Sequence, residues 1–215
     1  MKNKMILITI ASVLLIGGFF AGIKLYQSKE AQRLEAMLKE NLTKFIPSYA
    51  PTLGPSNPEV YLIEFFDPEC ESCREFHPLV KMIMEEHPGK IQLVMRYAPF
   101  HGNSKFAIKI LEAARKQGKY WEALEVLYQY QPQWGSHHDP KPELIWQYLP
   151  QAGVDVERIK TEMNDPAIEA MIAKEISDGQ ALGVRGTPSF FVNGKPLQVF
   201  GLEPLRSLIK ENLEN

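Results

Sequence analysis

Residues 64–73 read EFFDPECESC, a short apolar run that passes through Asp67-Pro68 into a pair of cysteines. The run begins at Val60, is rich in β-branched and aromatic residues, and is bounded by proline on both sides. This pattern is typical of a buried strand. After the first cysteine, apolar residues recur at helical spacing to about His87, where Pro88-Gly89 ends the pattern. The sequence therefore predicts a strand that leads directly into a helix, with the cysteines at the junction.

A second apolar run, Ile91–Tyr97, predicts another strand, so this part of the chain reads strand, helix, strand. Two strands joined in this way lie parallel in one sheet. Residues 103–183 then carry apolar residues at helical spacing, and Asp165-Pro166 combines a capping residue with proline at the first helical position. We therefore expect helices throughout the middle of the chain.

The chain is expected to close with a hairpin and a helix. Ser189–Val192 and Lys195–Phe200 flank Asn193-Gly194, and this dipeptide supplies the two positive-φ residues of a type I′ turn. The last helix is predicted at Glu203–Leu213. This order of elements indicates an α/β fold.

The N-terminal segment is expected to cross a membrane. Met5–Ile23 contains no charged residue, and as a helix it would be roughly 28 Å long at ~1.5 Å per residue, close to the ~30 Å hydrocarbon core of a bilayer. We assign residues 1–24 as an uncleaved signal anchor and transmembrane helix. A cleaved signal peptide is the alternative, but no clean small-x-small cleavage site follows the apolar run.

Residues 25–58 are predicted to hold an amphipathic helix and a proline-rich linker. Leu34, Leu38 and Leu42 recur every four residues among polar ones. Such a helix can pack on its own domain, lie on the membrane or pair with a copy of itself, and these readings stay open. Four prolines within residues 46–59 predict a semi-rigid spacer without an element of its own, so the folded domain is expected at residues 59–215.

The chain has two cysteines, Cys70 and Cys73, and a pair three positions apart cannot connect distant parts of a fold. Their value is therefore local chemistry. At the first turn of a helix, Cys70 faces unsatisfied backbone N–H groups and the positive helix end, which stabilise a thiolate. Cys73 lies one turn on, on the same face and close enough to form a disulfide. We expect Cys70 to attack and Cys73 to resolve the mixed disulfide.

A structural short-loop disulfide and half of a zinc site are the alternatives for this pair. Zinc takes about four ligands, and the five histidines show no second paired spacing with the cysteines. Neither alternative needs a strand–helix junction. We predict no metal and no cofactor beyond the disulfide of the pair, and we expect His101 to be a loop or capping residue.

These residues carry a resemblance to a known family. Residues 64–73, together with Gly186-Thr187-Pro188 before the hairpin, resemble the DsbA-like branch of the thioredoxin superfamily, and the likeness covers roughly residues 57–213. It implies a thioredoxin-like fold with an inserted helical domain, here at about residues 103–183. It also implies thiol–disulfide oxidoreductase activity.

The resemblance gives further residues a role. Pro188, after Thr187, matches the family's cis-proline, whose loop lies beside the disulfide and presents backbone groups to a bound peptide as its substrate-binding site. Glu64, six residues before Cys70, matches a buried acid that relays a proton to the resolving cysteine. The alternative for Glu64 is a carboxylate at the exposed edge of the strand. Pro78 matches a kink in the active-site helix.

The dipeptide between the cysteines departs from the family. Glu71-Ser72 stands where strongly oxidising relatives have Pro-His, and Asp67, Glu69 and Glu75 add further acid near Cys70. Negative charge disfavours a thiolate, so we expect a site less oxidising than the family's extreme. We expect an oxidase-like enzyme; a disulfide isomerase or reductase, and a non-catalytic thioredoxin-like binding module, stay open.

The partners follow from charge and from the cysteine chemistry. The net charge is -2, with acidic and basic residues mixed along the chain, so no basic surface indicates nucleic acid. Disulfide chemistry places the domain in the periplasm or extracytoplasmic space, on a single-pass protein of the inner (cytoplasmic) membrane. We expect cysteine-containing exported proteins and a membrane redox partner.

Overall fold

The computed structural model describes residues 44–136 and 138–214. The predicted anchor at residues 1–24 and the helix through Leu34, Leu38 and Leu42 lie outside these ranges. Within them, none of the helices combines the length and the apolar character that a membrane span requires. The described residues from Ile46 onward belong to one compact unit.

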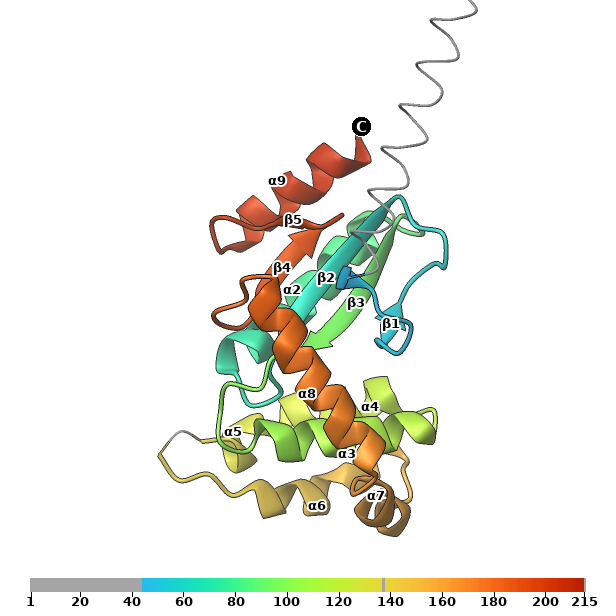
Figure 1. The fold of residues 1–215 in the computed structure, drawn as a ribbon, viewed down its shortest axis with the longest axis vertical. Coiled ribbons are helices and arrows are strands. Elements are labelled where there is room, and N and C mark those ends of the chain that lie inside the picture. Colours follow the sequence, from blue (N-terminus) through green and yellow to red (C-terminus); the bar gives the residue numbers. More distant parts are fainter. Residues whose placement is uncertain (1–43, 137, 215) are drawn as a thin grey trace, which may run out of the picture. The chain divides into compact units, whose positions relative to one another are not determined.

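Within the described residues, the strands form one five-stranded sheet in the order β1-β3-β2-β4-β5 (Figure 1). Its strands are β1 (Thr52–Leu53), β2 (Val60–Phe66), β3 (Ile91–Tyr97), β4 (Ser189–Val192) and β5 (Lys195–Pro196). β2 and β3 are parallel, and every other neighbouring pair is antiparallel. Helix α2 (Glu71–Glu86) connects β2 to β3, which confirms the strand–helix–strand unit.

Helices cover both faces of the sheet. In Figure 1, α8 (Pro166–Ala181) crosses the front of the sheet, and α2 lies behind it. On the α8 side, Gly179 brings the helix against the ring of Phe65, because a Cβ there would lie 3.6 Å from that ring. On the other side, α9 (Leu202–Leu213) packs on β2 and β4. Alternate residues of β2 therefore enter two different layers.

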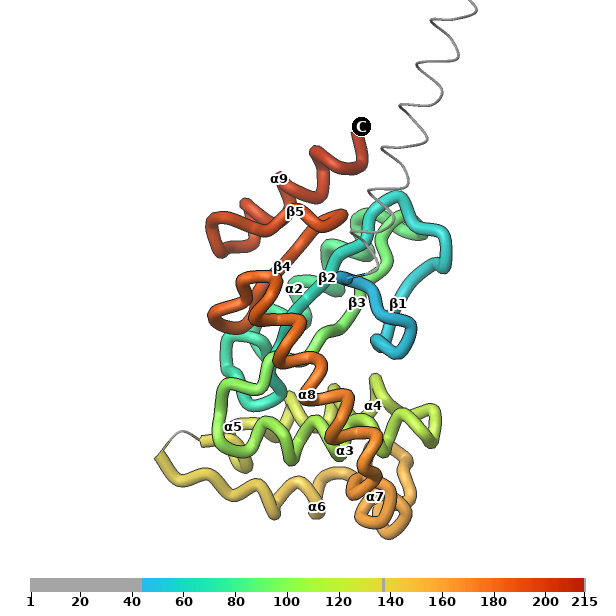
Figure 2. The backbone as a smooth tube through the Cα atoms, in the orientation of Figure 1, coloured from blue at the N-terminus to red at the C-terminus, as the bar shows by residue number. Residues whose placement is uncertain are grey.

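The helical region leaves the sheet after β3 and returns to it through α8, as the tube in Figure 2 shows. Its other elements are α3 (Ser104–Lys116), α4 (Tyr120–Gln129), α5 (Gln131–Trp134), a 3₁₀ turn (Pro142–Leu144), α6 (Ile145–Tyr148), a second 3₁₀ turn (Leu149–Ala152) and α7 (Val156–Glu162). The Asp165 carboxylate accepts a hydrogen bond from the Ala167 N–H at 2.9 Å, and Pro166 occupies the first turn. The predicted start of α8 is therefore confirmed.

Two expectations about the strands need correction. The prediction that residues 46–59 contain no element is wrong, because β1 pairs with β3. Proline is tolerated beside a short edge strand, where its missing N–H breaks no ladder, and the Pro51 carbonyl here accepts from the Met95 N–H at 2.9 Å. The strand predicted at Lys195–Phe200 is only the two residues of β5. The turn before it is as expected, since Asn193 (φ 49°) and Gly194 (φ 82°) are both left-handed.

A buried ion pair fastens α8 to β3. The Arg96 Nε atom donates to both carboxylate oxygens of Glu175 at 2.9 Å, and Arg96 Nη2 donates to Asp178 at 2.8 Å. Glu175 also accepts from the Tyr97 N–H at 2.8 Å and from the Tyr49 hydroxyl at 2.6 Å. Both Arg96 and Glu175 are buried, so each depends on the other for compensation of its charge.

Glu175→Gln is expected to lower the free energy of unfolding by about 3 kcal/mol, because the variant leaves Arg96 with only part of its counter-charge in a dry site. Urea unfolding followed by circular dichroism measures this. The control is Glu157→Gln, which removes an exposed partner of Lys160 and should change stability far less. Equal effects from the two variants would contradict the structural role of the pair.

Candidate active site

Cys70 occupies the N-cap position of α2, with extended backbone angles (φ −76°, ψ 123°). Its N–H donates to the Asp67 carbonyl at 3.0 Å, which closes the turn between β2 and α2. Its sulfur lies 3.3 Å from the Thr187 carbonyl oxygen, and the Thr187–Pro188 peptide bond is cis. The side chain is 7% exposed. The fold thus brings together residues 117 positions apart in sequence, Cys70 and Thr187.

The pKa of the Cys70 thiol is lowered to about 6. The largest cause is a hydrogen bond from the Cys73 thiol, and the backbone N–H groups of Ser72 and Cys73 add to it. Partial burial acts in the opposite direction. Donors at the start of a helix favour the charged form of a sulfur, so Cys70 is largely a thiolate at neutral pH.

Cys73 lies one turn further along α2 and is fully buried. Burial raises the pKa of its thiol far above the ordinary value, and the hydrogen bond to Cys70 and the charge of Glu64 act in the same direction. The Asp67 N–H lies 3.5 Å from the sulfur and is a weak donor to it. Both cysteines are free thiols in this structure. One sulfur therefore favours the thiolate and the other the neutral thiol.

Glu64 is buried in β2 and lies in register between Met95 of β3 and Phe190 of β4. Neither carboxyl oxygen has a hydrogen-bond partner. Burial, and then the nearby charge of Cys70, raise the pKa of this carboxyl to about 8. The alternative of an exposed edge position is wrong, and Glu64 carries a proton at neutral pH next to the cysteine pair.

The Asp67 carboxylate accepts several hydrogen bonds at the site, a role that the sequence analysis did not predict. Its Oδ2 atom accepts from the Phe100 N–H at 2.7 Å, from His101 Nδ1 at 2.8 Å and from the Ser104 hydroxyl at 2.7 Å. Its Oδ1 atom accepts from the Glu69 N–H at 2.9 Å. A signal was available: Asp67 follows β2 and His101 follows β3, and the carboxyl ends of parallel neighbours meet at one edge of a sheet.

The other carboxylates near the pair are engaged elsewhere. Glu69 accepts from the N–H of Asn103 at 2.7 Å and from its side-chain amide at 2.8 Å. Glu71 is exposed, and Glu75 lies 3.7 Å from Arg74. Solvent and specific donors hold these charges, and none of these carboxylates is among the main causes of the shift in the Cys70 pKa.

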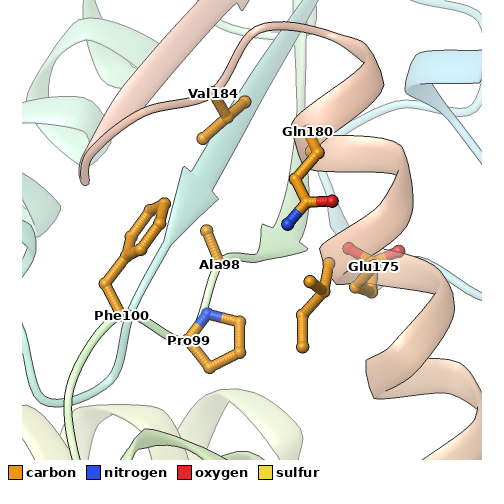
Figure 3. Close-up of a pocket in the computed structure, with 8 residues that line it drawn as sticks. Ala98, Pro99, Phe100, Glu175, Gln180 and Val184 are labelled. Atoms are coloured by element: carbon orange, nitrogen blue, oxygen red, sulfur yellow. The ribbon is translucent and has the colours of Figure 1, made fainter.

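A pocket of about 190 Å³ borders the loop held by Asp67 (Figure 3). Ala98, Pro99 and Phe100 form one wall, and Gln180 of α8 extends toward the pocket from the other side. Phe100 is 54% exposed. No cysteine lines this pocket, so it adjoins the loop beside the dithiol without containing it. Among the described residues, no group of three or more His, Cys, Asp or Glu side chains is arranged to hold a metal ion.

Comparisons with known proteins identify the family of this fold. The family profile described as thioredoxin matches residues 48–211. A Bacillus cereus protein named probable disulfide bond formation protein D is 31% identical over 160 residues, covering 70% of this chain and 73% of that protein. A thioredoxin-like oxidoreductase from Silicibacter pomeroyi superposes with a TM-score of 0.70 and 28% identity, covering 80% of this chain and 98% of that chain.

Other relatives are much longer proteins. The Na(+)/H(+) antiporter NhaA of Herminiimonas arsenicoxydans is 28% identical over 145 residues, which is 67% of this chain. The chain spans only about a fifth of the length of these antiporters, 22% in this case.

In the reduced protein, Cys70 is expected to react with iodoacetamide at half its maximal rate near pH 6, because the thiolate is the nucleophile. Cys73 should stay unmodified well above neutral pH. Mass spectrometry of the two peptides across pH 4–9 measures both. The Cys73→Ala variant, which lacks the main donor to Cys70, should shift the half-maximal pH upward; an unchanged profile would contradict the assigned cause.

Glu64→Gln is expected to stabilise the protein increasingly as the pH rises. An unfolded Glu ionises near 4.5 and the folded side chain near 8, so the folded state binds the extra proton between these values. Through this group the wild type loses stability as the pH rises across that window, and the variant does not. The difference should reach on the order of 4 kcal/mol by pH 8. Urea unfolding at pH 5, 6.5 and 8 measures it, and parallel curves would contradict the buried neutral carboxyl.

Proposed function

This chain belongs to the thioredoxin family, and from that premise we propose that it is a thiol–disulfide oxidoreductase of DsbA type acting through Cys70 and Cys73. The observation that carries the proposal is the opposite ionisation of the two sulfurs. The pKa of Cys70 is lowered to about 6, whereas burial raises the pKa of Cys73. A thiolate at the start of the helix and a neutral thiol one turn behind it are what a two-step exchange requires.

In the proposed reaction, the oxidised enzyme carries a Cys70–Cys73 disulfide. A substrate thiolate attacks the Cys70 sulfur, a substrate–Cys70 bond forms, and the electron pair of the broken bond goes to Cys73. The neutral Glu64 carboxyl, with its pKa near 8, gives its proton to that leaving sulfur. A second substrate thiolate then attacks the substrate sulfur bound to Cys70. The substrate leaves oxidised, and Cys70 is released as a thiolate.

We propose that the enzyme acts mainly as an oxidase. A stabilised Cys70 thiolate lowers the free energy of the reduced enzyme, which makes its disulfide a stronger oxidant. A pKa of about 6 lies between the values of about 7 and about 3.5 that mark thioredoxin and a strongly oxidising DsbA. The potential should accordingly lie between theirs.

We propose that Thr187 and Pro188 receive the substrate backbone. Support comes from the Thr187 carbonyl, which lies 3.3 Å from the Cys70 sulfur. An extended peptide that presents its cysteine to Cys70 would pass along this loop and pair with its backbone groups.

We further propose that residues 1–24 anchor the domain at the outer face of the cytoplasmic membrane. The uncharged run Met5–Ile23 and the disulfide chemistry support this placement. The substrates would be cysteine-containing exported proteins, and a membrane redox partner would reoxidise the enzyme. Ion transport is not carried over from the antiporters, because the chain spans about a fifth of their length.

Cys73→Ala should accumulate mixed disulfides with exported proteins through Cys70, because the resolving thiol is gone. The full-length variant, isolated in detergent after acid quenching, is analysed on non-reducing gels. Cys70→Ala is the matched control and should form no such adducts.

Equilibration of the wild type with glutathione buffers should give a potential between about −270 and −120 mV. An absence of adducts favours a binding module, and a potential at the reducing limit favours a reductase.

A further inference from the structure

The imidazole of His101 is held by the buried carboxylate of Asp67, in the loop that leads to the dithiol. The Nδ1 atom of His101 lies 2.8 Å from Asp67 Oδ2, and the His101 N–H also donates to Asp67 Oδ2 at 3.2 Å. Ser104 donates to the same oxygen and receives the His101 N–H at 3.1 Å. The ring therefore has a fixed position at the N-terminal end of α3.

The residue that holds His101 also touches both cysteines. The Asp67 carbonyl accepts from the Cys70 N–H at 3.0 Å, and the Asp67 N–H lies 3.5 Å from the Cys73 sulfur. The contacts of Asp67 thus join the imidazole to the turn that carries Cys70. Asp67 is completely buried, which keeps water away from these contacts.

The charges around the ring favour an imidazolium. The hydrogen bond and the charge of Asp67, followed by the charges of Cys70 and Glu69, raise the pKa of His101 against the effect of partial burial. Such coupling is reciprocal: an interaction by which the Cys70 thiolate favours the imidazolium must favour the thiolate by the same free energy. His101 and Cys70 are only partly shielded from solvent, so the stabilisation of the Cys70 thiolate by the imidazolium is moderate.

No cation stands between the cysteines to do the same. The intervening residues are Glu71 and Ser72, and the next residue, Arg74 after Cys73, lies 3.7 Å from Glu75. His101 reaches the site instead from the loop after β3, 34 residues from Asp67.

We propose that His101, held in place by the buried carboxylate of Asp67, is a positioning residue that supplies the positive charge for the Cys70 thiolate. The inference rests on the proposed function and deepens it, since it names a group that adds to the Cys73 thiol and the helix N–H groups in favouring the Cys70 thiolate. Below the pKa of the thiol, Cys70 is neutral. Above the pKa of His101, the imidazole is neutral and its contribution is lost.

The wild-type protein provides the first test. The ring of His101 is titrated by NMR in the reduced and in the disulfide form, with its signals assigned by their loss in His101→Gln. The pKa of His101 should be higher in the reduced form, because the thiolate exists only there. Equal values in the two forms would overturn the proposal.

A matched pair of variants provides the second test. His101→Gln keeps a donor for Asp67 but is neutral at every pH, whereas His87→Gln changes a histidine at the far end of α2. At pH 6, alkylation of Cys70 should fall by about two- to threefold in His101→Gln and remain unchanged in His87→Gln. Above pH 9 the rates of all three proteins should converge. A decrease of equal size at every pH would indicate a structural role and overturn the proposal.

The result is separable from the proposed function. Adduct formation by Cys73→Ala tests disulfide exchange, whereas the titrations above test only the coupling of His101 to Cys70. If the protein traps no substrate but the titrations of His101 and Cys70 are coupled, the proposed function is wrong and the role of His101 stands. The opposite outcome would keep the enzyme and remove the role of His101.

Discussion

Cys70 and Cys73 are chemically identical and three residues apart, but their surroundings give their thiols opposite pKa shifts. Cys70 lies where the first N–H groups of α2 have no partner within the helix, and Cys73 lies one turn deeper, against the core. The helix end stabilises charge on the first sulfur, and desolvation opposes charge on the second. Everything else at the site depends on this difference, because an exchange reaction needs one sulfur that attacks and one that stays protonated until it is needed.

The sheet accommodates a neutral acid on one face and an ion pair on the other. Glu64 has no hydrogen-bond partner on the α2 side of β2, and a buried polar group in such a position costs stability. Arg96 of the adjacent strand faces α8, where Glu175 and Asp178 compensate its charge. The cost of Glu64 is understandable if its proton is used, because a paired carboxylate could not supply one to Cys73. In β2 a buried acid is left without a partner, whereas in β3 a buried base is fully paired.

Local patterns in the sequence were sufficient for much of this fold. The β2–α2 junction, the capped start of α8 and the Asn193-Gly194 turn each depend on a few consecutive residues, whose backbone preferences act wherever they occur. The edge strand β1 and the contact of Asp67 with His101 depend on partners more than 30 residues away. The prolines of residues 46–59 indicated a linker because they restrict the backbone locally. Pairing with β3 nevertheless makes part of this segment a strand.

The placement of charge at the site follows from topology. Adjacent parallel strands end at the same edge of the sheet, so the residues after β2 and β3 meet whatever their distance in sequence. Because Glu71-Ser72 places no cation between the cysteines, the sequence alone makes this chain look deficient in positive charge. The carboxylates that surround Cys70 in sequence are held by Asn103, by solvent or by Arg74, whereas the imidazole of His101 is held nearby by Asp67. The effect of a charge on a sulfur depends on how close and how buried that charge is. The loop after β3 brings His101 close to the site, and the buried Asp67 holds it there.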